Sequence, residues 1–409
     1  METTGRCLVC GTDRLEEVVS LTPTPPANAI APTAELARAQ ERYPLDLVRC
    51  AGCGLVQLVD VIPRSVLFAD YRYATGAAPA LVDHCRALAT LVTDRLGLAA
   101  GARVLEIGSN DGTQLSFFAD RGMRVLGVDP AVELGVHAQE HGVPTLTTHF
   151  GVETVEKILG DIGPVDAVLG SNVLAHVNDV NGVLQAIRRL LKPGGAAVIE
   201  VAHVLPMVRH GIFEFVYHEH LSYFSLHVLA RAAEANGLAV FDAELIPTQG
   251  GSLRCWMGRD DDARTPTAEF DRILKVEADA GVPGGGFLDG FANRVERVCT
   301  TLDDVLGGLS KAGRRICGYG ASARAVTLLS QAGVGDRIAW IVDDNPRKVG
   351  GFTPGDGIPV VGSDRLTAGS ADYCVLFAWN FEAGIRARSA TFSAAGGSFV
   401  VPFPELSIR

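Results

Sequence analysis

The fold of this chain is decided by residues 104–112, which read Val104-Leu105-Glu106-Ile107-Gly108-Ser109-Asn110-Asp111-Gly112. The mostly apolar first half predicts a buried strand, and the glycines predict a tight turn into a helix. Glycine at such a turn lets a ligand approach the backbone closely. A dinucleotide site would carry a third glycine to admit a pyrophosphate, whereas this turn carries acidic and amide groups. Those groups suit a ligand that bears an ammonium group and no phosphate.

A second strand-like run ends at Asp129, twenty-three residues after Glu106. An acidic side chain at this distance can accept hydrogen bonds from ribose hydroxyls, so the spacing supports an adenosine ligand. Short apolar runs alternate with helical patterns through this region, and they lie at 104–107, 124–128, 167–169 and 196–201. Strands that alternate with helices predict a parallel sheet covered on both faces.

Two further segments complete the series. Gly170-Ser171-Asn172-Val173-Leu174 follows the third run, and Leu191-Lys192-Pro193-Gly194-Gly195 precedes the fourth. In this order, the four segments resemble the class I methyltransferases, which bind S-adenosylmethionine. The resemblance implies a Rossmann-like α/β domain with S-adenosylmethionine as its cofactor. It places five residues in the cofactor site, namely Glu106, Gly108, Asn110, Asp129 and Asn172.

The chain has 409 residues, more than one ordinary core holds, and its composition predicts several parts. Strand and helix alternation restarts late in the chain, with strands at 315–319, 338–342 and 373–377, which predicts a second Rossmann-like α/β unit. We therefore expect a zinc-binding module at 1–70, a methyltransferase domain at 71–260, a helical connection at 261–309 and a C-terminal α/β domain at 310–409.

Two Cys-x-x-Cys pairs occupy the N-terminal module, and thirty-nine residues separate Cys10 of the first from Cys50 of the second. Four thiolates, from Cys7, Cys10, Cys50 and Cys53, suit tetrahedral zinc and leave no coordination position open. The sequence therefore predicts a structural zinc ion that closes a long loop. A redox-active Cys pair is the alternative.

One short segment is dense in titratable side chains: Phe213-Glu214-Phe215-Val216-Tyr217-His218-Glu219-His220-Leu221-Ser222-Tyr223-Phe224. Histidines two apart share a helical face poorly, which predicts a loop or extended segment that faces a cavity. Histidine can accept a proton at neutral pH, and a neighbouring carboxylate can orient it. Methylation at carbon needs such a base, because a C–H bond beside a ketone must lose its proton before it attacks a methyl donor.

The Cys-x-x-Cys pairs, Glu-Ile-Gly-Ser-Asn-Asp-Gly and Tyr-His-Glu-His-x-Ser-Tyr-Phe, in that order, resemble the sugar C-methyltransferases of deoxysugar biosynthesis. The resemblance spans essentially the whole chain. It implies a nucleotide-linked 4-keto-6-deoxysugar, of the dTDP type, as the substrate, methylated at C3. It also implies that His220 is the base, although the sequence does not exclude His218. The other catalytic residues that it implies are Tyr71, His176, Tyr217 and Glu219.

The segment Cys317-Gly318-Tyr319-Gly320-Ala321-Ser322-Ala323-Arg324 follows a strand and opens a helix, whose N–H groups can receive a diphosphate. In the family that the chain resembles, the C-terminal domain helps to hold the nucleotide. We therefore expect Gly320 and Ser322 to contact the substrate. The turn lacks the third glycine of a dinucleotide site, so no bound NAD is inferred.

The formal net charge of −11 argues against nucleic acid and anionic membranes as partners, and no protein partner is inferred. No run of about twenty apolar residues occurs, and the cytoplasm is the expected location. Three other functions stay open: methylation at oxygen or nitrogen of a small molecule, a zinc-containing scaffold without chemistry, and an NAD-dependent sugar oxidoreductase.

Overall fold

The computed structural model describes residues 2–67, 74–77 and 79–409. Its largest sheet has the strand order β12-β13-β10-β9-β6-β7-β8. The strands from β10 to β8 run parallel, and β13 is antiparallel to both of its neighbours. The bounds are β6 Arg103–Ile107, β7 Arg124–Val128, β8 Thr145–Leu146, β9 Val165–Ser171, β10 Leu191–Ala202, β12 Leu238–Ile246 and β13 Ser252–Arg259. This sheet confirms the class I, Rossmann-like fold predicted for the central domain.

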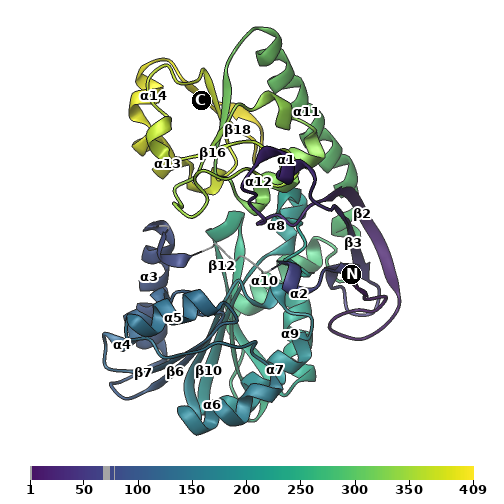
Figure 1. Ribbon diagram of the computed structural model, residues 1–409. Coiled ribbons are helices and arrows are strands. Elements are labelled where there is room, and N and C mark those ends of the chain that lie inside the picture. Colours follow the sequence, from purple (N-terminus) through teal and green to yellow (C-terminus); the bar gives the residue numbers. More distant parts are fainter. Residues whose placement is uncertain (1, 68–73, 78) are drawn as a thin grey trace.

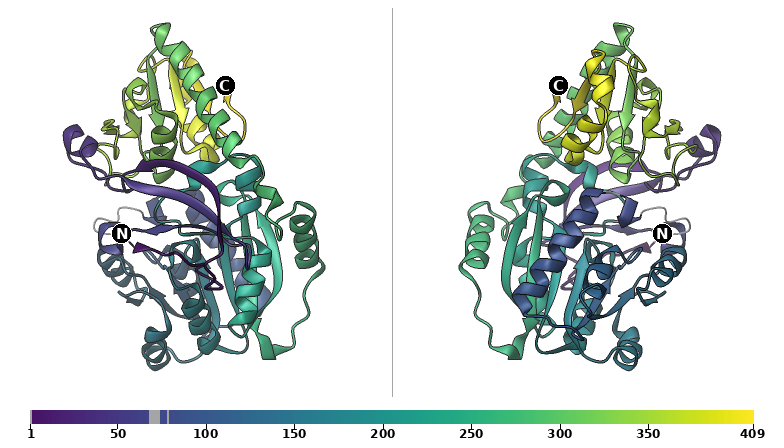
Figure 2. Two further views of the ribbon diagram at one scale, coloured as in Figure 1. Left: turned by 90° about the vertical axis from the view of Figure 1, so that its right-hand side faces the viewer. Right: turned by 90° about the vertical axis from the view of Figure 1, so that its left-hand side faces the viewer.

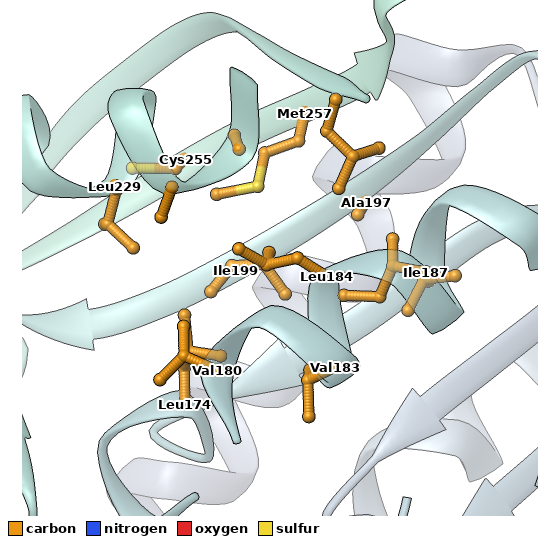
Figure 3. Packing of buried hydrophobic residues seen from close by; sticks show 14 of the residues in the cluster. Leu174, Val180, Val183, Leu184, Ile187, Ala197, Ile199, Leu229, Cys255 and Met257 are labelled. Atoms are coloured by element: carbon orange, nitrogen blue, oxygen red, sulfur yellow. The ribbon is translucent and has the colours of Figure 1, made fainter. Parts of the chain in front are cut away.

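Helices cover both faces of the central sheet. They are α3 Pro79–Leu96, α4 Thr113–Ala119, α5 Val132–Glu140, α6 Val155–Asp161, α7 Val180–Leu190, α9 Leu226–Ala235 and α10 Ala268–Asp279. Side chains alternate along β6, so Val104 joins the core under α3 and α4, whereas Leu105 joins the core under α6, α7 and α9. In Figure 3, Leu184 and Ile187 of α7 lie beside Ile199 of β10. The apolar stripe of α7 at helical spacing thus seals this face of the sheet.

The C-terminal domain contains a six-stranded sheet in the order β16-β15-β14-β17-β18-β19. All neighbours are parallel except β19. Its elements are β14 Ile316–Tyr319, β15 Ile341–Val342, β16 Val360–Val361, β17 Tyr373–Leu376, β18 Ser398–Val401, β19 Ser407–Ile408, α12 Ala323–Ala332, α13 Glu382–Arg388 and α14 Ala390–Ala394. The helix α11 (Phe291–Lys311), which falls mostly in the expected connection, packs against α12. The predicted second α/β unit is therefore present.

The N-terminal module forms a four-stranded sheet in the order β11-β4-β3-β2, and a further pair joins β1 to β5. Its elements are β1 Glu2–Thr3, β2 Leu15–Thr24, α1 Ala34–Arg38, β3 Tyr43–Cys50, β4 Val56–Leu58, β5 Asp60–Val61 and α2 Arg64–Leu67. The edge strand β11 (Ser222–Tyr223) comes from the segment rich in titratable residues and pairs with β4. The module and that segment are thus parts of one sheet.

The long β2–β3 ribbon lies beside the junction of the central and C-terminal domains (Figure 1, Figure 2). One apolar core contains Leu45 and Leu47 of β3, Val208 of α8 (Val204–Arg209), Leu302 of α11 and Leu328 of α12. The N-terminal module therefore shares its core with the rest of the protein. Within the described ranges, no helix combines the length and the apolar character needed to cross a membrane.

Candidate active site

The four cysteines of the N-terminal module converge at one end of the β2–β3 ribbon. Their Sγ atoms all lie within 4.8 Å of one another, and Cys10 alone is exposed. The main-chain N–H groups of Gly52 and Cys53 point at Cys50 Sγ from 3.2 and 3.4 Å. Such N–H groups stabilise thiolates, and four convergent sulfurs suit tetrahedral zinc. Because all four ligands come from the protein, the geometry fits a structural ion and no catalytic one.

The glycine turn after β6 closes over the carboxyl end of the central sheet. Gly108 has φ +68°, and a Cβ added there would lie 2.2 Å from Val173 Cγ2. Asp129, at the end of β7, accepts the main-chain N–H of Asn110 at 2.9 Å and that of Ala131 at 2.8 Å. The carboxyl ends of β6 and β7 are therefore held together. The space at Gly108 admits no side chain.

Buried polar atoms without a partner point to a polar ligand at this turn. Among the described residues, Glu106 Oε2, Ser109 Oγ and Gln114 Nε2 are buried and make no hydrogen bond. Burial, reinforced by Asp129 and Asp111, raises the pKa of Glu106 well above its usual value. A cationic ligand would relieve this cost, because carboxylates without partners are expensive in the interior. The donor set thus fits S-adenosylmethionine, whose ammonium and sulfonium groups are positive.

Two asparagines of the predicted cofactor site adopt left-handed backbone conformations, with φ 52° at Asn110 and 56° at Asn172. The Oδ1 atom of Asn110 accepts the main-chain N–H of Thr75 at 2.8 Å, so this side chain holds the segment before α3. The main-chain N–H of Asn172 donates to Glu200 O on β10. The sequence did not indicate that Asn110 connects the turn to residue 75.

His220 lies at the centre of the titratable segment, only 5% exposed. Its Nδ1–H donates to the Phe215 carbonyl at 3.0 Å, and its Nε2 accepts the Tyr217 hydroxyl at 2.7 Å. The Phe215 carbonyl therefore fixes the tautomer in which Nε2 carries a lone pair. His220 is oriented by these two groups, whereas the sequence had offered a neighbouring carboxylate for that task.

His176 follows β9 and joins this cluster from the central domain. The centroids of the His176 and His220 rings lie 4.8 Å apart, and His176 also interacts with the main chain of Glu219. Burial lowers the pKa of His176 to about 4 and that of His220 well below its usual value. Both imidazoles are therefore neutral near pH 7.

His218 points away from this cluster. Its Nε2–H donates to the carbonyls of Tyr43 and Pro44, at 3.3 and 3.1 Å, at the start of β3. It therefore holds the N-terminal ribbon and takes no part in the hydrogen bonds that orient His220.

Glu219 is 4% exposed, and burial raises its pKa to about 7. Its Oε1 accepts the Nδ2–H of Asn28 at 2.7 Å, and the charge of Lys348 also favours the ionised form. A carboxyl group with this pKa changes its charge close to neutral pH.

The C-terminal domain contacts the titratable segment through α12. Arg324, in the first turn of α12, donates to Glu214, which also accepts Trp379 Nε1–H at 2.9 Å. Ser322 caps the same helix, and Gly320 has φ +97° just before it. The predicted substrate residues Gly320 and Ser322 thus lie at the helix end that contacts the titratable segment.

Sequence patterns missed Asn28 and Lys348 and the pairing of Glu214 with Arg324. The hydrogen bond from Asn28 to Glu219 spans 191 positions, and that from Arg324 to Glu214 spans 110. Asn28 and Lys348 stand in no quoted motif, and nothing in the spacing of the two quoted segments pairs Glu214 with Arg324. Tyr71, which the family resemblance places in the site, lies outside the described residues.

Three known protein families match successive parts of the chain. The family described as "Methyltransferase domain" matches residues 82–243, and "C-methyltransferase C-terminal domain" matches residues 247–404. A third family, described as a zinc binding domain, matches residues 7–68.

A relative covers almost the whole chain. C-methyltransferase NovU from Streptomyces niveus is 35% identical over 403 residues, which is 98% of this chain and 95% of that protein. Ubiquinone biosynthesis O-methyltransferase from Methylocella silvestris is 31% identical over 37% of this chain and 64% of that protein. Among solved structures, 1,6-didemethyltoxoflavin-N1-methyltransferase from Burkholderia thailandensis is 20% identical with a TM-score of 0.35, over 50% of this chain and 95% of that chain.

Proposed function

The chain belongs to the family of S-adenosylmethionine-dependent C-methyltransferases, and we propose that it methylates C3 of a nucleotide-linked 4-keto-deoxysugar, of the dTDP type, through an enolate. The observation that carries this proposal is the geometry of His220. Its Nε2 is deprotonated and buried, as a general base requires, and the Tyr217 hydroxyl lies beside it as a donor for the ketone oxygen.

In the proposed reaction, His220 Nε2 takes the proton from C3. The Tyr217 hydroxyl, which donates to Nε2 in the ligand-free protein, turns to the ketone oxygen and stabilises the negative charge that develops there. This exchange of partners frees the Nε2 lone pair. S-adenosylmethionine, when bound, supplies an electrophilic methyl group.

Two further groups support His220 in this scheme. The His176 ring packs edge-on against the His220 ring, with 4.8 Å between the ring centroids. Glu219 is ionised above about pH 7, and its negative charge would offset the positive charge that His220 gains. We therefore assign Glu219 to the catalytic group as a carboxylate, and we expect turnover to fall as the pH drops below 7.

The C-terminal domain is assigned to the nucleotide part of the substrate. The N-terminus of α12 follows directly on this turn, and a Cβ at Gly320 would lie 2.8 Å from Ala378 Cβ. Lys348 donates to the Ala321 carbonyl at 2.9 Å, so a cation lies next to this turn. Helix N-termini and cations suit a diphosphate, which supports a nucleotide-linked sugar.

The structural zinc ion belongs to the proposal as well, with Cys7, Cys10, Cys50 and Cys53 as its ligands. Its place at the far end of the ribbon supports a role in folding.

The proposed substrate class is tested by incubating the protein with S-adenosylmethionine and a panel of nucleotide-linked 4-ketosugars. We expect a mass gain of one CH₂ unit, and NMR should place the new methyl group on carbon. The same sugars reduced to alcohols at C4 are the matched controls and should not react, because no enolate can form. Methylation of the reduced sugars, or a methyl group on oxygen or nitrogen, would overturn the proposal.

Asp129→Ala is expected to weaken S-adenosylmethionine binding by roughly 1.5–3 kcal/mol, because charge-assisted hydrogen bonds to the ribose are lost. Part of the loss should come through Asn110, whose N–H loses its acceptor. Isothermal titration calorimetry measures the change. Asp129→Asn keeps one acceptor oxygen and should lose less. An unchanged affinity in Asp129→Ala would remove Asp129 from the site.

A further inference from the structure

The proline-rich loop that joins β2 to α1 reaches Tyr217 and Glu219 of the titratable segment. Ala27 is buried against Ala323 and Val326 of α12, and Tyr217 packs on the same group. The next residue, Asn28, is half-buried and donates from Nδ2 to Glu219 Oε1 at 2.7 Å. A residue of the N-terminal module therefore contacts the titratable segment of the central domain directly.

Hydrogen bonds hold this loop at Asn28 and at the three residues that follow it. The Ile30 N–H donates to the Asn28 carbonyl at 2.9 Å, and Gln40 Nε2 donates to the Ala29 carbonyl at 2.6 Å. Ala31 and Phe352 of the C-terminal domain exchange two main-chain hydrogen bonds, at 3.0 and 2.8 Å. Because the backbone is fixed, the amide of Asn28 is presented to Glu219 at little entropic cost.

We propose that Asn28 is a positioning residue of the reaction: its amide orients the Glu219 carboxylate, so the module with the four cysteines supplies part of the active site. The proposal rests on the methyl transfer proposed above, in which Glu219 acts as a carboxylate. Asn28 acts through Glu219 and is not itself assigned to the substrate.

The charge state of Glu219 depends on this contact. A hydrogen bond from an amide N–H favours the ionised carboxylate and so lowers its pKa. Burial acts in the opposite direction and is the larger cause, which leaves the pKa at about 7. Lys348 also acts on the Glu219 carboxyl group and favours its ionisation, whereas His176 interacts with the Glu219 main chain. Loss of the Asn28 amide should therefore raise the pKa further.

The test is the pH dependence of kcat in Asn28→Ala. We expect the acidic limb, which reflects protonation of Glu219, to move to higher pH by about one unit, the shift expected for loss of one charge-assisted hydrogen bond. Turnover at neutral pH should fall several-fold and recover in alkaline buffer. Asn28→Asp, which removes the donor and adds a like charge at nearly constant size, should shift the limb at least as far.

Gln40→Ala is the matched control, because it removes a contact of the same loop without touching Glu219. It should leave the acidic limb where the wild-type protein has it. In Glu219→Gln the limb should be absent, and adding Asn28→Ala to that variant should change nothing more. The proposal is overturned if the acidic limb of Asn28→Ala lies at the same pH as that of the wild-type protein. It is also overturned if Gln40→Ala shifts the acidic limb as far as Asn28→Ala does.

A second measurement separates this proposal from the proposed reaction. The Glu219 carboxyl can be titrated by NMR with ¹³C-labelled glutamate and assigned through Glu219→Gln, without any turnover. The same upward shift is expected in Asn28→Ala. If the shift occurs but no ketosugar is methylated, the proposed function fails, whereas the effect of Asn28 on the Glu219 carboxyl group stands. If methylation occurs without the shift, Asn28 has no such role.

Discussion

His220→Asn is expected to lower methyl transfer by roughly 10²–10⁴-fold, the usual cost of removing a general base, while both ligands still bind. The asparagine amide can still donate to the Phe215 carbonyl, but it offers no basic nitrogen at the position of Nε2. The loss should therefore appear in kcat, with dissociation constants for S-adenosylmethionine and substrate close to wild type. Rapid-mixing assays and calorimetry measure the two quantities.

The same base can be followed without methyl transfer. With S-adenosylhomocysteine in place of the methyl donor, the wild-type protein should exchange the C3 proton of the ketosugar with solvent deuterium. His220→Asn should lose this exchange. His218→Asn is the matched control, and it should lower stability through β3 while exchange persists. The opposite pattern would make His218 the base, and full exchange in both variants would move the base to another residue.

Cys50→Ser is expected to remove zinc from the protein and to unfold the cysteine end of the N-terminal sheet. Wild-type protein should carry about one zinc ion per chain, because the four sulfurs form one closed site. Structural zinc supplies roughly 10–16 kcal/mol of apparent binding free energy in zinc-finger peptides, so its loss outweighs the stability of a small sheet. Metal analysis and hydrogen exchange over residues 7–58 measure both effects.

In Cys50→Ser, we expect methyl transfer to weaken before cofactor affinity does. Cofactor affinity should survive at first, because the glycine turn belongs to the central sheet. Methyl transfer should weaken with the ribbon, because β4 pairs with β11 and the loop before α1 carries Asn28. Cys299→Ser, a half-buried cysteine outside the cluster, is the control and should keep its zinc. Zinc-free wild-type protein, or Cys50→Ser with a full complement of zinc, would contradict the assignment.

Local patterns were sufficient for the fold and the position of the cofactor turn. The run at 104–107 matches β6 (Arg103–Ile107), and the run at 124–128 matches β7. A strand buried on both faces is apolar over most of its length, and the turn after it needs glycine at positive φ. These requirements act within a few residues, so they are visible in the sequence without knowledge of the partner strands.

The sequence by itself thus determined the α/β class, the glycine turn, the two cysteine pairs and a segment dense in titratable side chains whose histidines share a helical face poorly. Only the tertiary structure decided that Phe215 sets the tautomer of His220, that His218 holds β3, and that Asn28 reaches Glu219. The physical reason is the range of these contacts. A main-chain carbonyl can orient an imidazole whatever its side chain is, and a hydrogen bond across 191 positions imposes no spacing on the chain.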